Sequence, residues 1–107
     1  MSEQTAAQKA YADIAPAFAD ISDRVLFGEV WKHPALSPRD RSLATVAALI
    51  SGYRSNELPY HLKLALQNGV TKDEIVETII HLAFNAGWPA ASTALAIART
   101  AFAEAGV

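Results

Sequence analysis

The segment Thr71-Lys-Asp-Glu-Ile-Val-Glu-Thr-Ile-Ile-His-Leu-Ala83 decides the fold, because it carries both the start signal and the periodicity of a helix. Thr71 followed three residues later by Glu74 is a capping box, in which each side chain accepts a hydrogen bond from the other residue's backbone amide. Apolar residues then recur at spacings of three and four, which is typical of the buried stripe of an amphipathic helix. The expected stripe is Ile75, Val76, Ile79, Ile80 and Ala83.

The rest of the chain also predicts helices, because glycine and proline fall at expected helix ends and no alternating run of β-branched residues occurs. Ser37 is an expected N-cap with Pro38 at the first helical position, and Gly52 closes that helix. The expected helices cover about residues 4–12, 16–27, 38–51, 56–68, 71–87 and 89–105, with a turn or short helix at 28–36. The sequence therefore predicts an all-α fold.

Length and charge limit the class of protein. The chain has 107 residues, 51% hydrophobic and 19% charged, which fits a single domain over residues 1–107. A formal net charge of -2 leaves no basic excess for a nucleic acid or an anionic membrane, so we expect neither as a partner. No apolar run of about 18 residues and no leader-like start at residues 1–4 occur, which favours a soluble cytoplasmic protein.

The chain contains no cysteine, which excludes disulfides, thiolate metal sites and cysteine-based redox chemistry. The three histidines, His33, His61 and His81, do not form an HxH or HExxH pattern. We therefore expect no metal site unless the fold brings distant ligands together.

The last expected helix is apolar around much of its circumference, and one small core cannot cover all of that surface. We infer a homo-oligomer from this stripe, although alanine also raises helix propensity on its own. The stripe consists of Ala90, Ala91, Ala94, Leu95, Ala98, Ala101, Phe102 and Ala105.

Glu57 and His61 lie four residues apart where a helix is expected to begin. Residues at this spacing share one helix face, so a carboxylate and an imidazole are available to the same substrate for acid–base chemistry. The alternative is an ordinary solvated face, since exposed pairs of this kind are common.

Several ordered motifs give the chain a specific resemblance to the carboxymuconolactone decarboxylase-like proteins, within the broader AhpD-like group. The resemblance covers about residues 27–98 and implies an AhpD-like helical bundle that assembles into trimers or hexamers with active sites near subunit contacts. The motifs are Phe27-Gly-Glu-Val-Trp31, Leu36-Ser-Pro-Arg-Asp-Arg-Ser-Leu43, Glu57-Leu-Pro-Tyr-His61, Asn68-Gly-Val-Thr71 and His81-Leu-Ala-Phe-Asn-Ala-Gly-Trp-Pro89.

The resemblance also separates two chemistries within the group. In the AhpD-like relatives a Cys-x-x-Cys pair before a histidine reduces peroxides, and here those two positions are Arg54 and Glu57, ahead of His61. Residual peroxidase activity is therefore disfavoured. The decarboxylase members need no cofactor, because the electrons left by carbon dioxide spread through the substrate to its lactone carbonyl.

The resemblance implies a cofactor-independent decarboxylase, or a related acid–base enzyme, acting on a small carboxylated lactone such as 4-carboxymuconolactone. Such a site requires a donor at the developing oxyanion, a proton donor and an apolar wall. The implied residues are Arg39 or Arg41 for the oxyanion, His61 with Glu57 for the proton, Trp31, Phe84 and Trp88 for the wall, and Ser42 and His81 as further substrate-binding residues.

Each assignment has an alternative. Successive helical residues point about 100° apart, so at least one of Arg39 and Arg41 can be a solvated cap, and the resemblance favours Arg41 as the functional one. Trp31 and Trp88 suit core or interface anchors as well as substrate walls. His33 stands where decarboxylases carry an arginine, which leaves the substrate open. The alternative function is a non-catalytic oligomeric small-molecule-binding protein of the same fold.

Overall fold

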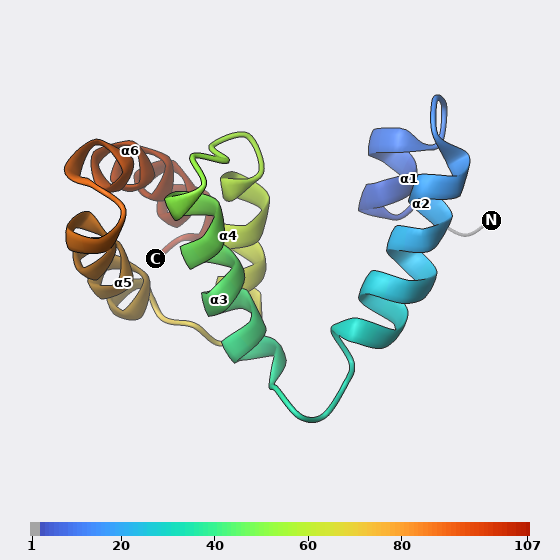
Figure 1. Cartoon of the computed structure of the whole chain (residues 1–107), viewed down its shortest axis with the longest axis horizontal. Helices are drawn as coiled ribbons and strands as arrows, with labels where there is room; N and C mark the ends of the chain where they lie inside the picture. Colours follow the sequence, from blue (N-terminus) through green and yellow to red (C-terminus); the bar gives the residue numbers. More distant parts are fainter. Residues whose placement is uncertain (1–2) are drawn as a thin grey trace. The chain divides into compact units, whose positions relative to one another are not determined.

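A computed structural model describes residues 3–107, and the chain divides into two compact units (Figure 1). The first unit ends at Ser37 and the second runs from Pro38 to Val107. The described residues form helices and no strand, which confirms the all-α prediction. The single-domain expectation stays a prediction.

The first unit consists of α1 (Ala6–Tyr11), α2 (Pro16–Ile21) and the π-helix η1 (Ser22–Val30). A capping box formed by Thr5 and Gln8 starts α1 at Ala6, two residues later than the predicted start at residue 4. The rings of Tyr11 and Phe18 meet edge to face with centroids 4.9 Å apart, which joins α1 to α2.

The predicted end of the second helix at Phe27 is wrong, because the chain stays helical to Val30 as a π-helix. The wider π-type turn brings backbone five residues apart into contact. A Cβ atom on Gly28 would lie 2.9 Å from the carbonyl oxygen of Asp23, so the absence of a side chain permits this turn. Periodicity of 3.6 residues does not reveal such a segment.

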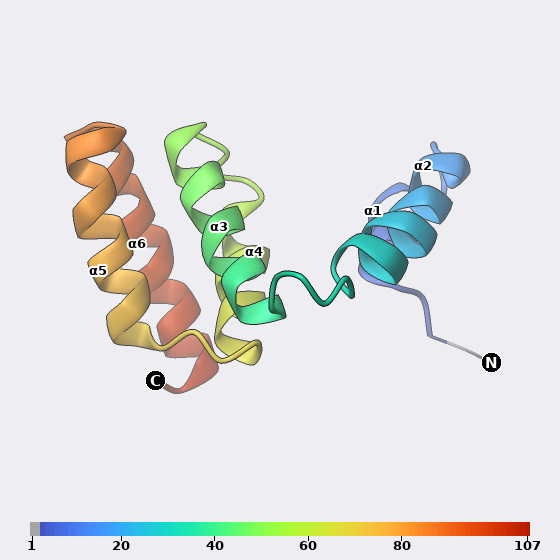
Figure 2. The same cartoon turned by 60° about the horizontal axis from the view of Figure 1, so that its bottom comes forward.

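The second unit is a four-helix bundle of α3 (Pro38–Ser51), α4 (Leu58–Gln67), α5 (Lys72–Asn85) and α6 (Trp88–Ala105). Figures 1 and 2 show α5 beside α6 and α3 beside α4. In addition, α3 packs against α5 and α4 packs against α6. The α3–α4 side and the α5–α6 side therefore lie on opposite sides of the bundle.

The core of this bundle follows the predicted stripes with one correction. Ile75 and Ile79 are completely buried, as expected, but Leu82 is buried where Ile80 was expected, and Ile80 is 45% exposed. In α6, Leu95 is 42% exposed and Ala105 is also exposed, so the core of this unit leaves part of the predicted apolar circumference uncovered. The buried apolar residues of the bundle are Val46, Ile50, Leu58, Leu62, Ala65, Val70, Ile75, Ile79, Leu82, Ala90, Ala91, Ala94, Ala98, Ala101 and Phe102.

Helix ends agree with the turn chemistry of the sequence. The predicted capping box is confirmed: the Thr71 hydroxyl accepts from the Glu74 amide at 3.1 Å, and the Glu74 carboxylate accepts from the Thr71 amide at 2.9 Å. α4 starts at Leu58, two residues later than expected, with Pro59 in its first turn. No helix within residues 3–107 has the length and apolarity that crossing a membrane requires.

Replacement of Thr71 by alanine should lower the free energy of unfolding by about 1 kcal/mol, because the Glu74 amide loses its capping acceptor. The measurement is urea unfolding followed by circular dichroism, with Thr100→Ala, an exposed position inside α6, as the control. Equal midpoints for the two variants would contradict a stabilising role for this cap.

Candidate active site

Glu57 and His61 lie together at the start of α4. Glu57 is the N-cap residue and is exposed, while His61 is half-buried one turn later. The His61 amide donates a hydrogen bond to the Glu57 carbonyl oxygen at 3.4 Å. The predicted pair is therefore local to one helix end, with one partner in solvent and the other at the edge of the core.

Burial and charge act in opposite directions on His61. Burial lowers the pKa of the imidazole because it disfavours the imidazolium ion, and the negative charge of Glu57 partly offsets this by raising it. The Nδ1 atom is buried, and the ring of Tyr60 meets the imidazole edge to face at 5.0 Å between centroids. The lowered pKa favours the neutral ring, which is able to accept a proton.

The face of α4 that carries His61 points toward α3. Asn68 follows His61 by seven residues, or two helical turns, and so shares its face. The Asn68 amide donates to the Ser42 hydroxyl of α3 at 2.9 Å, which fixes the facing flanks of the two helices. Ser42 itself is fully buried and links α3 to the end of α4, and its role in substrate binding stays a prediction.

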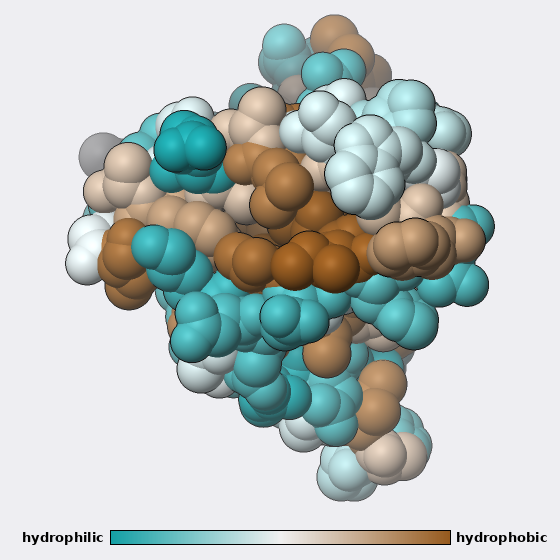
Figure 3. All heavy atoms as spheres, turned by 90° about the vertical axis from the view of Figure 1, so that its left-hand side faces the viewer, coloured by the Kyte–Doolittle hydropathy of each residue, from teal (hydrophilic) through white to brown (hydrophobic). Residues whose placement is uncertain are grey.

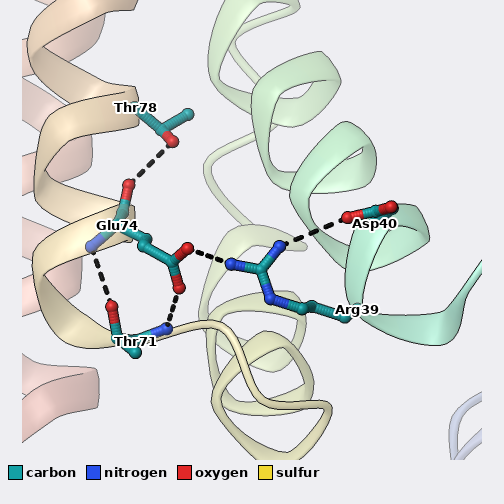
Figure 4. Close-up of polar contacts among 5 residues, drawn as sticks. All are labelled: Arg39, Asp40, Thr71, Glu74 and Thr78. Carbon is teal, nitrogen blue, oxygen red and sulfur yellow. Dashed lines mark hydrogen bonds and ion pairs between the residues drawn. The ribbon is translucent and has the colours of Figure 1, made fainter.

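The two candidate arginines leave α3 on different sides. Arg39 forms ion pairs with Glu74 of α5 and with Asp40, the latter at 3.2 Å (Figure 4). The hydrogen bond to Glu74 raises the pKa of Arg39. The pKa of Glu74 is lowered, mainly by the hydrogen bond from the Thr71 amide and next by the hydrogen bond from Arg39. The guanidinium of Arg39 thus joins α3 to α5.

Arg41 lies 200° around α3 from Arg39 and 100° from Ser42, at about 100° per residue. Because Ser42 faces α4 and Arg39 faces α5, this rotation places Arg41 on the α4 side of α3. It is half-buried, and its carbonyl oxygen accepts from the Thr45 hydroxyl at 2.8 Å. Of the two arginines, Arg41 is therefore the one on the side of the bundle that carries His61.

Phe84 and Trp88 line a groove between α5 and α6. Phe84 is 81% exposed and Trp88 is 70% exposed, with ring centroids 6.4 Å apart. The groove has a volume of about 470 Å³, and Figure 3 shows an apolar band across this face. Since α5–α6 and α3–α4 lie on opposite sides of the bundle, the second unit does not bring these two rings to His61.

The remaining expected site residues lie elsewhere. His81 is exposed on α5, seven residues after Glu74, and so lies on the flank of α5 that faces α3. Trp31 is half-buried in the first unit and stacks on Phe27 with centroids 6.0 Å apart. Residues 3–107 contain no group of three histidine, aspartate or glutamate side chains able to hold a metal ion.

The titration of His61 tests these electrostatics. Its midpoint, followed by the imidazole proton resonances in NMR, should lie below the ordinary value of about 6.5. Glu57→Gln should lower the midpoint further, because it removes the charge that favours the imidazolium, whereas Glu104→Gln at the end of α6 should leave it unchanged. An unchanged midpoint in Glu57→Gln would show that the carboxylate does not act on this ring.

Comparison with known families gives one match over most of the chain. The profile of the carboxymuconolactone decarboxylase family matches residues 16–100, a range that runs through both units. This range includes Glu57, His61 and the two candidate arginines, Arg39 and Arg41.

Three similar proteins were found among characterised and named sequences. The 4-carboxymuconolactone decarboxylase of Acinetobacter baylyi is 41% identical over 90 residues, covering 84% of this chain and 67% of the relative. The nitrosuccinic acid decarboxylase of Metarhizium robertsii is 37% identical over 71 residues, covering 66% and 50%. An uncharacterised 15.0 kDa protein of Paracoccus denitrificans is 35% identical over 80 residues, covering 73% and 60%. The matches thus span from half to two thirds of the relatives' own length.

Proposed function

The chain belongs to the carboxymuconolactone decarboxylase family, and from this premise we propose that it is a cofactor-independent carboxy-lyase acting on a small carboxylate. The observation that carries the proposal is the half-buried imidazole of His61 with the Glu57 carboxylate one turn before it. A neutral ring beside a carboxylate at the edge of a core is suited to moving one proton.

The names of two relatives point to one class of substrate. 4-Carboxymuconolactone and nitrosuccinic acid each carry a carboxylate near a group that withdraws electrons. In the lactone the alkene passes the electron pair to the carbonyl oxygen, and in the nitro acid the nitro group accepts it. We infer that the substrate of this chain contains its own electron acceptor and that 4-carboxymuconolactone is the first candidate.

The proposed reaction breaks the bond between carbon and the carboxylate, and its electron pair moves into the substrate's acceptor group as carbon dioxide leaves. An anionic substrate beside His61 favours the imidazolium form, so the ring takes a proton from solvent as substrate binds. The imidazolium then gives this proton to the carbon, while Glu57 stabilises the charged ring. The reaction consumes the carboxylate group of the substrate and one proton, and it forms one carbon dioxide and one C–H bond.

Arg41 is the proposed donor to the oxyanion that develops on the substrate. Its position on the α4 side of α3 supports this role, and the engagement of Arg39 with Glu74 argues against that residue. A fixed cation near the acceptor group stabilises the transition state more than the ground state, because the charge arrives there only as the bond breaks.

Decarboxylation should be measured as carbon dioxide release from 4-carboxymuconolactone and from nitrosuccinic acid. We expect His61→Ala and Glu57→Gln to lower kcat by about 10²-fold or more, because each removes part of the proton transfer. Thr100→Ala, at an exposed position of α6 that has no proposed role in the reaction, is the control. If the protein binds the lactone but releases no carbon dioxide, the alternative function holds: a non-catalytic ligand-binding protein of the same fold.

We also propose that the chain forms a homo-oligomer, a trimer or hexamer, through the α5–α6 face. The exposure of Ile80, Phe84, Trp88 and Leu95 on neighbouring turns supports this, since a contiguous apolar patch on a soluble bundle usually marks a contact surface. In such an assembly the aromatic rings of one copy are available to cover the site of another.

Light scattering at micromolar concentration tests the assembly. The wild-type mass should be a multiple of 11.5 kDa, and Leu95→Glu should lower it because a charge would be buried in the contact. Thr100→Glu, also exposed on α6, is the control. A wild-type monomer would rule out the oligomer, and an unchanged mass in Leu95→Glu would remove this face from the contact.

A further inference from the structure

α3 ends in a turn that holds a tyrosine in a left-handed conformation. The Arg54 amide donates to the Leu49 carbonyl oxygen at 2.8 Å and the Tyr53 amide donates to that of Ile50 at 3.2 Å, which together form a Schellman motif. Tyr53 has φ 57°, and among residues 3–107 it is the one residue other than glycine with a positive φ. Such a conformation is unfavourable for a residue with a Cβ atom.

Two other helices of the same bundle end in the same way with glycine. Gly69 (φ 99°) follows α4, and Gly106 (φ 75°) follows α6. In the first of these turns the Val70 amide donates a hydrogen bond to the Ala65 carbonyl oxygen at 2.9 Å. In the second the Val107 amide donates to the Phe102 carbonyl oxygen at 3.0 Å. A cap alone would therefore favour glycine at position 53, which directs attention to what the tyrosine side chain contacts.

The Tyr53 side chain reaches the turn between α5 and α6. Its hydroxyl donates to the carbonyl oxygen of Ala86, the C-cap residue of α5, at 3.2 Å. Its ring lines a cavity of about 40 Å³ together with Ser55 and Leu58 on one side and Ala90 of α6 on the other. Tyr53 thus fastens the exposed segment 52–57 to the α5–α6 turn at the same end of the bundle (Figure 2).

Backbone hydrogen bonds continue from this turn to the acid–base pair. The Glu57 amide donates to the Arg54 carbonyl oxygen at 3.3 Å, and the His61 amide donates to that of Glu57 at 3.4 Å. The segment leading to Glu57 is otherwise exposed and has no buried side chain before Leu58. The position of the Glu57 carboxylate therefore depends on how firmly this segment is anchored.

We propose that Tyr53 is a positioning residue, whose hydroxyl bond to Ala86 fixes segment 52–57 and so holds Glu57 beside His61. The inference rests on the proposed function of that pair. Tyr53 acts through the backbone and does not itself contact the substrate. It is 64% exposed, so the hydroxyl bond to Ala86 is the contact through which it acts.

The test uses Tyr53→Phe, which keeps the ring and removes the hydroxyl, and Tyr53→Gly, which supplies the usual residue for the turn. Both should lower kcat about tenfold or more while KM changes less than about threefold, because a displaced carboxylate impairs proton transfer more than binding. Both should also lower the NMR titration midpoint of His61, in the direction of Glu57→Gln, since the charge of Glu57 moves away. Tyr11→Phe, a tyrosine of the first unit, is the control.

The titration separates this inference from the proposed function. If the wild type releases no carbon dioxide from either acid, a lowered His61 midpoint in both variants still supports the positioning role. An unchanged midpoint in both variants overturns it, even where activity falls, because a merely structural turn would not alter the field at His61. Tyr53→Gly with wild-type midpoint and wild-type kcat would show that the residue is only a cap.

Discussion

The packing of the second unit depends on the small side chains of α6. Ala90, Ala94, Ala98 and Ala101 form a buried row that lets α4 and α5 approach the same helix closely. Larger side chains there would push α4 and α5 outward. The row thereby sets the separation between the start of α4, where His61 lies, and the end of α5, where Ala86 accepts the bond from Tyr53. The separation of these two helix ends thus depends on a helix that carries neither His61 nor Tyr53.

Polar contacts give α3 its rotation within this packing. Arg39 joins it to Glu74 of α5, and Ser42 joins it to Asn68 of α4. The Arg39 pair is partly exposed and contributes little free energy by itself. Two contacts on adjacent flanks of one helix nevertheless restrict its rotation about its own axis, because any turn would separate at least one of them. This restriction determines which side of the bundle Arg41 faces.

The sequence predicted those features that arise from neighbouring residues. The capping box of Thr71, the helix from Pro38 to Ser51 and the pairing of Glu57 with His61 at the start of α4 are all local. The ion pair of Arg39 spans 35 residues and has no signature in the sequence. The π-helix was missed because its period differs from 3.6, and the role of Tyr53 was hidden because Gly52 beside it is the residue normally expected at a helix end.

The distribution of tryptophan has a spectroscopic consequence. The chain has two tryptophans, and each compact unit contains one: Trp31 stacks on Phe27 in the first, and Trp88 lies 70% exposed on the first turn of α6 in the second. Indole emission reports the polarity around the ring, so a single Trp→Phe replacement leaves a natural fluorophore in one unit at a time. The unfolding of each unit is therefore visible separately without any added label, and the emission of Trp88 reports the polarity at the α5–α6 groove.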